Sequence, residues 1–240
     1  MLMQFVNTLL DGYEQRIAGF YPCPVVVYTL ASCWHRRFSI LCLSERPGYG
    51  PIRVVGRPRD EVSVSVPVLI LPGFGNSGSQ HWQTLWELRH PDWQRVNLGE
   101  WDRPTCDDWI HALDVAVRAC PSPPILVAHS LACLLVAHWV HRLSRVPKGA
   151  FLVAVPDPKS DSFPVSARGF DPVPLLPFMF RSLVVASAND SLGSPAYAKH
   201  CAMAWGSRFI DIGQAGHINI DSGHGEWPEG YDLFQQYVAE

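Results

Sequence analysis

The chain has 240 residues, enough for one domain of ordinary size with some length to spare. Hydrophobic residues make up 48% and charged residues 17%, which is typical of a globular protein with a substantial core. The net charge of −3 argues against binding to nucleic acid or acidic lipid, and no apolar run approaches the roughly 20 residues that cross a bilayer.

Cysteine usage points to a reducing compartment. The chain has seven cysteines at irregular spacings and no C-x-x-C, so neither a disulfide framework nor a zinc site is predicted. The one set of conceivable metal ligands, His217, Asp221 and His224, matches no known motif spacing. We therefore expect a cytoplasmic protein with free thiols, no metal and no cofactor.

The first 61 residues differ in composition from the rest of the chain. Residues 46–60 are rich in Pro, Gly and Arg, as linkers are. Asp11 and Glu14 precede an apolar stretch, which does not fit a secretory signal peptide. We predict an N-terminal extension over residues 1–61, poorly ordered or produced by a mis-assigned start, followed by a domain over residues 62–240. No methionine lies between Met3 and Met179, so a shorter product would need another start codon.

From residue 62 on, apolar runs alternate with amphipathic segments. Strands are predicted at residues 64–71, 93–97, 124–128, 150–155, 182–187 and 209–212. Helices are predicted between and after them, at residues 79–89, 105–119, 131–143, 195–205 and 231–238. This alternation predicts an α/β fold: a three-layer α/β/α sandwich around a mostly parallel sheet of about six strands. In such a sheet ligands bind beyond the carboxyl ends of the strands, so each catalytic candidate should directly follow a strand.

Ser130 stands at the most informative place in the chain. It follows the strand at residues 124–128 and precedes a helix, with Ala128 and Ala132 two residues to either side. This pattern indicates the nucleophile elbow of an α/β-hydrolase, with alanines in place of the usual glycines. Only small side chains fit there, because strand and helix come very close at a strained turn. The alternative is a structural serine that caps its helix.

Asp190 and His217 also follow predicted strands. With Ser130 they give the chain order Ser, Asp, His that α/β-hydrolases use. A serine needs an imidazole to take its proton, and the imidazole needs a carboxylate to fix its tautomer. Taken singly, Asp190 could be a turn or cap residue and His217 a turn residue, but together they favour a catalytic triad. His129, inside the elbow, cannot easily turn back on Ser130.

The glycine-rich loop at residues 71–79 is predicted to approach the substrate. In this fold such a loop supplies one oxyanion N–H and the residue after the nucleophile supplies the other. We assign these to Phe74 and Leu131, with Gly75 as the alternative for the first. A phosphate loop is disfavoured because no Gly-Lys-Ser/Thr ends it. Gly75, His81 and Trp82 are the candidate substrate contacts. Core packing is the favoured alternative for Trp82, and a surface position at the start of a helix is the favoured alternative for His81.

The stretch from residue 156 to residue 180 has no clear helical period. Phenylalanines within it could form a small apolar lid or side wall: Phe163, Phe170, Phe178 and Phe180. Larger hydrolases insert a cap at this place in the chain, but here there is room only for a loop. We therefore expect a lidless hydrolase with a shallow, open site.

Several short stretches together resemble one family. They are LPGFGNS from residue 71, QHWQ from residue 80, VAHSLA from residue 127, VASAND from residue 185 and AGHIN from residue 215. Over roughly 170 residues the chain resembles the small serine hydrolases related to retinoblastoma-binding protein 9 and the bacterial YdeN proteins. The resemblance implies a Ser-Asp-His triad at Ser130, Asp190 and His217. The chain has no L-x-C-x-E stretch, so binding to a retinoblastoma protein is not implied.

The sequence thus predicts a serine hydrolase that cleaves a small ester, or an amide or thioester, through an acyl-enzyme. The expected partner is a small acyl substrate; nucleic acid, membrane and protein partners are not indicated. Another reaction on the same fold, such as peptidase, acyltransferase or haloperoxidase-like chemistry, stays open. A rival from another class is a non-enzymatic interaction module on a hydrolase fold.

Overall fold

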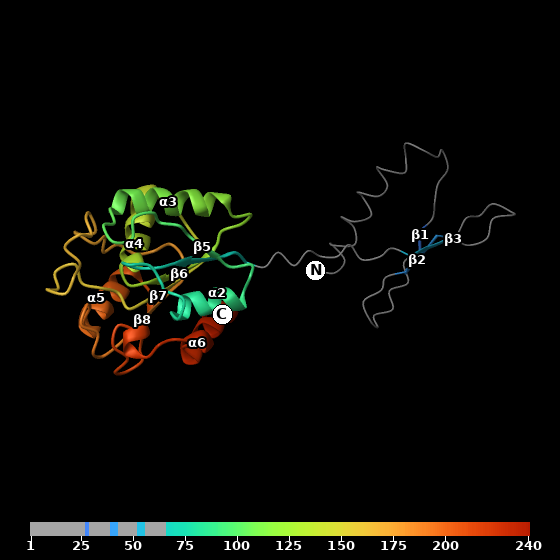
Figure 1. The fold of residues 1–240 in the computed structure, drawn as a ribbon. Helices are drawn as coiled ribbons and strands as arrows, with labels where there is room; N and C mark the ends of the chain where they lie inside the picture. Colours follow the sequence, from blue (N-terminus) through green and yellow to red (C-terminus); the bar gives the residue numbers. More distant parts are fainter. Residues whose placement is uncertain (1–26, 29–38, 43–51, 56–65) are drawn as a thin grey trace, which may run out of the picture. The chain divides into compact units, whose positions relative to one another are not determined.

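The computed structural model describes residues 66–240 throughout and, before them, only the backbone of three short strands, β1 (Val27–Tyr28), β2 (Ser39–Cys42) and β3 (Ile52–Val55) (Figure 1). These strands pair antiparallel in the order β1-β2-β3. Met1–Val64 and Ser65–Glu240 are separate units, and each is taken by itself. The expectation for residues 1–61 falls mostly outside the described residues and stays a prediction.

A parallel sheet forms the centre of residues 66–240. Its six strands are β4 (Val68–Leu71), β5 (Gln94–Arg95), β6 (Ile125–His129), β7 (Gly149–Val153), β8 (Ser182–Ala186) and β9 (Arg208–Asp211). They run in the order β5-β4-β6-β7-β8-β9, and every neighbouring pair is parallel. The predicted sheet is confirmed. Two strands are much shorter than predicted. β4 covers only the second half of the strand predicted at residues 64–71, and β5 lies at the edge of the sheet, where just two residues pair with β4.

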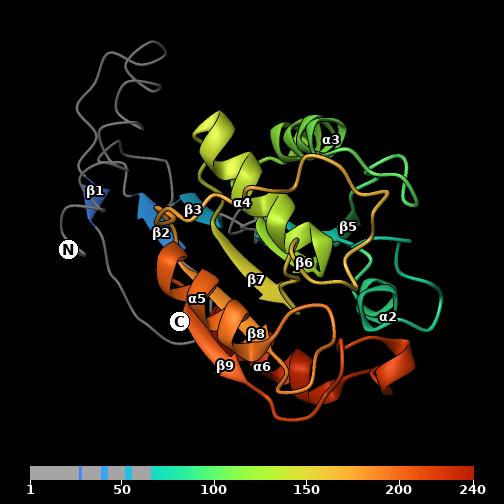
Figure 2. The ribbon, with the colours of Figure 1, turned by 90° about the vertical axis from the view of Figure 1, so that its left-hand side faces the viewer.

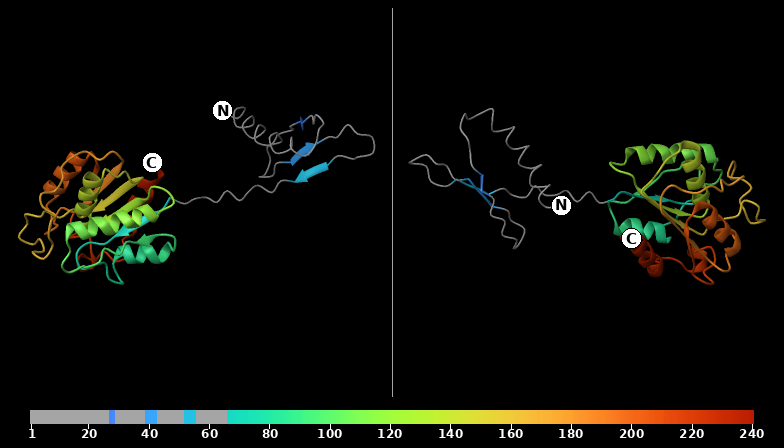
Figure 3. Two further views of the ribbon diagram at one scale, coloured as in Figure 1. Left: turned by 90° about the horizontal axis from the view of Figure 1, so that it is seen from above. Right: turned by 180° about the vertical axis from the view of Figure 1, so that it is seen from behind.

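Helices cover both faces of this sheet. The α-helices are α2 (Trp82–Arg89), α3 (Cys106–Ala119), α4 (Leu131–Leu143), α5 (Pro195–Trp205) and α6 (Pro228–Ala239). Figures 2 and 3 show α3, α4 and α5 on one face and α2 and α6 on the other. The predicted three-layer α/β/α architecture is therefore confirmed. A 3₁₀ helix, η1 (Ile220–Ser222), was not predicted.

Successive side chains of each strand enter opposite layers of the core. In β4, Leu69 and Leu71 pack with α3, α4 and α5, whereas Val68 and Ile70 pack with α2 and α6. Side chains of a strand alternate between the two faces of a sheet, so a strand buried on both faces must be apolar at every position. This explains the unbroken apolar runs from which the strands were predicted.

Helix α4 is the most deeply enclosed helix of the described part. Every residue from Leu131 to Val140 is buried. It runs directly from the carboxyl end of β6, the strand next to the middle of the sheet, so its first turn is fixed by packing on all sides. Among the described residues, no helix is long and apolar enough to span a membrane.

Candidate active site

The turn between β6 and α4 presents Ser130 in a strained conformation. Its φ is 54° and its ψ −125°, in a region that residues with a side chain rarely adopt. The Ser130 N–H donates to the Val153 carbonyl at 2.9 Å, which ties the turn to β7. Ala128 and Ala132 are completely buried on either side. The Ser130 side chain makes no capping hydrogen bond to α4, in contrast to the structural alternative considered for it.

Three side chains from three strand ends meet at this turn. The Ser130 Oγ lies 2.7 Å from the His217 Nε2. The His217 Nδ1 lies 2.9 Å from both carboxylate oxygens of Asp190. Since an ionised carboxylate can only accept, Nδ1 carries the imidazole proton and leaves Nε2 free to accept the hydroxyl proton of Ser130. The structure thus brings together the three residues predicted as a triad.

Asp190 is held by more than the imidazole. Its side chain is only 2% exposed, and Oδ1 also accepts the Leu192 N–H at 2.9 Å. A buried carboxylate needs such donors, because leaving one of its oxygens unsatisfied costs free energy. These contacts keep Asp190 in the position from which it orients His217.

The loop that carries His217 is fixed by three polar side chains for which the sequence analysis predicted no such role. The Ala215 N–H donates to the Ser187 Oγ at 2.9 Å, and the Gly216 N–H donates to the Asn189 Oδ1 at 2.8 Å. The His129 Nε2 lies 3.0 Å from the His217 carbonyl oxygen, to which it donates. Each of these three residues lies at or just after the end of a strand, close in sequence to a predicted triad residue. That position was the signal available in the sequence.

Backbone N–H groups near Ser130 can hold a developing oxyanion. Phe74 and Leu131 both line the cavity around Ser130. Within the part of the chain that the structure describes, neither the Phe74 N–H nor the Leu131 N–H donates a hydrogen bond to a backbone carbonyl. The Gly75 N–H instead donates to the Trp101 carbonyl at 3.0 Å. The geometry therefore favours Phe74 over the alternative, Gly75, as the donor from this loop.

The cavity above Ser130 has a volume of about 370 Å³. Besides the residues already named, it is lined by His81, Phe163, Leu192 and Ile220. η1 thus contributes a wall that was not predicted. Of the four phenylalanines expected to form a lid or side wall, only Phe163 lines this cavity. Phe170 and Phe178 are buried in the core instead.

Two of the predicted substrate contacts lie elsewhere. Trp82 is completely buried, and its indole N–H donates to the Ile218 carbonyl at 3.0 Å. Its ring packs against Trp86 and Trp227, so it belongs to the core between α2 and α6 rather than to the cavity. Gly75 does not line the cavity either. For these two residues the expected substrate contact is wrong.

His81 does line the cavity, and its ring is neutral. Burial, and to a smaller extent the nearby positive charge of Arg95, lowers its pKa from 6.5 to about 4. The neighbouring His129 ring, 4.9 Å away between centroids, has its pKa lowered well below the ordinary value, again mainly by burial. No group of three or more His, Cys, Asp or Glu side chains among the described residues is arranged to hold a metal ion.

Gln83 is a further residue that the sequence analysis missed. It is completely buried in the first turn of α2. Its Nε2 donates to the Leu71 and Val127 carbonyls at 3.0 and 3.1 Å, and its Oε1 accepts from the Ser77 Oγ at 2.7 Å. Gln83 therefore joins the ends of β4 and β6 to the loop that carries Phe74.

Comparison with known proteins identifies relatives over this whole domain. A serine hydrolase family model matches residues 68–236. A YdeN-like hydrolase of Pectobacterium atrosepticum is 34% identical, with a TM-score of 0.64, and the match covers 73% of this chain and 92% of that one. YdeN of Bacillus subtilis strain 168, whose name describes it as a hydrolase, is 23% identical over 185 residues, 72% of this chain and 96% of its own. Its crystal structure gives a TM-score of 0.58, covering 73% of this chain and 100% of that one.

Proposed function

Because the chain belongs to the serine hydrolase family, we propose that it cleaves small carboxylic esters through a triad of Ser130, His217 and Asp190. One observation carries this proposal: the unbroken hydrogen-bonded series from the Ser130 Oγ through the His217 ring to Asp190, at a strained strand-to-helix turn. Such a series makes a serine hydroxyl nucleophilic, because the imidazole accepts its proton as it attacks.

The proposed reaction has two halves. The Ser130 Oγ attacks the ester carbonyl while its proton passes to the His217 Nε2, and the N–H groups of Phe74 and Leu131 stabilise the negative oxygen. His217 then gives that proton to the departing alcohol, which leaves an acyl group on Ser130. In the second half His217 takes a proton from water, the hydroxide attacks the acyl carbonyl, and the acid departs as Ser130 regains its proton. Asp190 stabilises the imidazolium in both halves.

Two features support an enzyme rather than an interaction module. Ser130 is held in a costly backbone conformation and has an imidazole aimed at its hydroxyl, which a binding surface does not require. The cavity of about 370 Å³ suits a small acyl compound. Amides and thioesters undergo the same steps, so they remain second candidates for the substrate.

The cytoplasm is the proposed setting. The four cysteines that the structure describes are all free: Cys106, Cys120, Cys133 and Cys201. Free thiols persist in reducing compartments, whereas exported proteins of this size commonly form disulfides.

Labelling with a fluorophosphonate probe tests the proposal directly. The wild-type protein should be labelled on Ser130, and Ser130→Ala should lose all labelling. Ser122→Ala is a matched control, because Ser122 precedes β6 and so lies toward the end of the sheet opposite Ser130. A folded wild-type protein that stays unlabelled would contradict the proposal and favour the interaction module.

A further inference from the structure

The wall of the cavity that contains Ser130 carries a negative charge. Among the described residues that line this cavity, Asp221 is the one acidic or basic side chain apart from histidines. The rings of His81 and His129 are neutral, because burial lowers the pKa of each. The carboxylate of Asp221 therefore sets the charge that an entering substrate meets.

Asp221 is held close to the loop that carries His217. It lies in η1, four residues after His217, so their Cα atoms are at most about 14 Å apart. The Asn219 Oδ1 accepts the Ser222 N–H at 3.1 Å, and the Ser222 Oγ accepts the Asn219 N–H at 3.0 Å. Ser222 also packs on Gly216, where an added Cβ would lie 2.5 Å from the Ser222 Cβ. The position of Asp221 relative to His217 is thus set before a substrate arrives.

The carboxylate of Asp221 is available to a ligand. Asp221 is exposed, and it makes no hydrogen bond or ion pair with any other residue that the structure describes. The two buried aspartates differ in this respect, since Asp190 pairs with His217 and Asp114 with Arg145. An unpaired carboxylate in a cavity wall attracts a cationic group and repels an anionic one.

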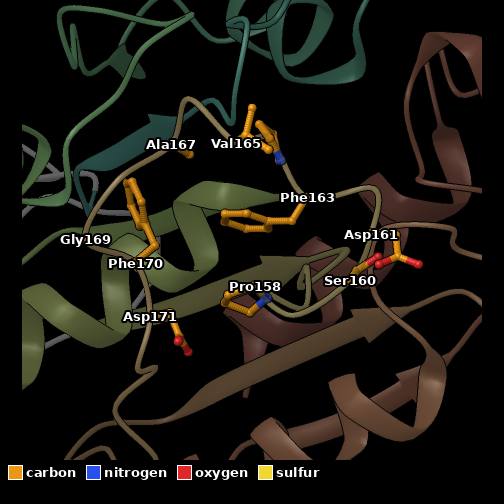
Figure 4. A pocket seen from close by; sticks show the side chains of 10 residues that line it. Pro158, Ser160, Asp161, Phe163, Val165, Ala167, Gly169, Phe170 and Asp171 are labelled. Atoms are coloured by element: carbon orange, nitrogen blue, oxygen red, sulfur yellow. The ribbon is translucent and has the colours of Figure 1, made fainter.

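A second hollow, between β7 and β8, adjoins this cavity and shares Phe163 with it. Its volume is about 440 Å³, and the surface that it offers is mostly polar and open to solvent (Figure 4). Its charged lining residues are again acidic, Asp161 and Asp171, and Figure 4 shows them on opposite sides of the view. Lys159 and Arg168, from the same segment, line neither cavity. Of the three aspartates, Asp221 alone lines the cavity that contains Ser130.

We propose that Asp221 is a specificity-determining residue, and that the preferred esters carry a positively charged group, such as an ammonium, in the part that faces η1. The inference rests on the proposed function. The cationic group pairs with the Asp221 carboxylate while the Ser130 Oγ attacks the ester carbonyl. Because this pair is exposed to solvent, it should favour a cationic ester over a neutral one by about twofold to fivefold, and less at high salt.

Three methyl esters of matched length test the charge on the acyl side. Methyl 6-aminohexanoate carries an ammonium, methyl heptanoate is neutral, and monomethyl pimelate ends in a carboxylate. In the wild-type protein at low ionic strength, kcat/KM should be at least about fivefold higher for the ammonium ester than for the carboxylate ester. Acetylcholine and its neutral isostere, 3,3-dimethylbutyl acetate, make the comparison on the alcohol side.

Substitutions at residue 221 should change the preference for charge. In Asp221→Asn the ratio of kcat/KM for the cationic ester to that for the neutral ester should fall about twofold to fivefold. In Asp221→Lys it should fall further, because a like charge then faces the cationic group. Asp232→Asn and Asp232→Lys are the matched controls and should keep the wild-type ratio, since Asp232 is exposed on α6 and lines neither cavity.

Salt gives an independent measurement of the same effect. Raising the ionic strength to about 1 M should bring the wild-type ratio close to that of Asp221→Asn, because the Debye length falls to roughly 3 Å. Ratios that neither substitution of Asp221 changes, on the acyl side and on the alcohol side, would overturn the role of Asp221. That result in a protein that the fluorophosphonate labels on Ser130 leaves the proposed function intact, whereas an unlabelled wild-type protein overturns both.

Discussion

Gly73 and Ser130 approach each other so closely that no side chain fits between them. A Cβ on Gly73 would lie 2.9 Å from the Ser130 Cβ, 2.9 Å from the His129 carbonyl oxygen and 3.3 Å from the Leu131 nitrogen. Real Cβ atoms essentially never show the first two of these separations, which are under 3.0 Å. The loop that carries Phe74 therefore rests directly on the elbow, and the absence of a side chain at residue 73 sets the distance between the two proposed oxyanion donors.

Gly73→Ala should accordingly separate the loop from the elbow. We expect kcat to fall on the order of 10²-fold, the cost of losing one oxyanion donor. KM should change much less, because the displaced N–H acts mainly on the charge that develops during the reaction. Gly225→Ala is the control, since its new Cβ would meet only the Gln80 carbonyl at an ordinary 3.5 Å. Equal kcat values for the two variants would contradict this role of Gly73.

The series Ser130–His217–Asp190 predicts losses that do not add. His217→Ala should lower kcat by about 10⁴–10⁶-fold, and Asp190→Asn by about 10⁴-fold. The double variant should be no worse than His217→Ala alone, because Asp190 acts only through the imidazole. His200→Ala, on the exposed face of α5, is the matched control. Steady-state kinetics on one ester measures all four proteins, and a loss below about tenfold in His217→Ala would remove it from the mechanism.

The order of elements and the place of the site could be read from the sequence because both depend on local patterns. A strand buried on both faces is apolar at every position, and a helix after it is periodic, so β6 and α4 were predicted within one residue. Ser130, Asp190 and His217 each follow a strand, and parallel strands bring their carboxyl ends together. Their catalytic roles stay a prediction.

What the sequence did not predict depends on contacts between distant segments. Trp82 was a candidate substrate contact because it follows a strand, yet Trp227 and the Ile218 carbonyl, far along the chain, hold it in the core. Phe170 is likewise buried against α3 and α4, through Trp109 and the His138 ring. The local pattern of apolar residues in these two segments does not indicate such distant partners.

Gln83 should prove to be a positioning residue. Gln83→Met keeps the side-chain length but removes two donors and one acceptor, so the Leu71 and Val127 carbonyls and the Ser77 hydroxyl each lose the hydrogen bond to this side chain. We expect the free energy of unfolding to fall by roughly 1.5–4.5 kcal/mol, since three hydrogen bonds are lost and each contributes about 0.5–1.5 kcal/mol net.

The Gln83→Met variant should also lose kcat more than it raises KM, because the loop that carries Phe74 is no longer tied to β4 and β6. A purely structural role would lower the stability without this kinetic asymmetry. Gln235→Met, on the exposed face of α6, is the control for the substitution itself. Urea unfolding and ester kinetics on the two variants decide the matter, and a Gln83→Met protein as stable as the wild type would contradict the prediction.

His81 should make the stability of the domain depend on pH. The pKa of its buried ring is about 4 in the folded protein and 6.5 when unperturbed, so between these values the unfolded chain binds a proton that the folded chain does not. The free energy of unfolding should therefore fall as the pH drops from 6.5 to 4, by up to about 3 kcal/mol for this residue. His81→Asn cannot titrate, yet it keeps a side-chain acceptor for the Gln83 N–H at the start of α2. Urea unfolding at several pH values should show a shallower decline in this variant. A constant difference in stability between variant and wild type from pH 7 to pH 4.5 would show that His81 is not the group responsible.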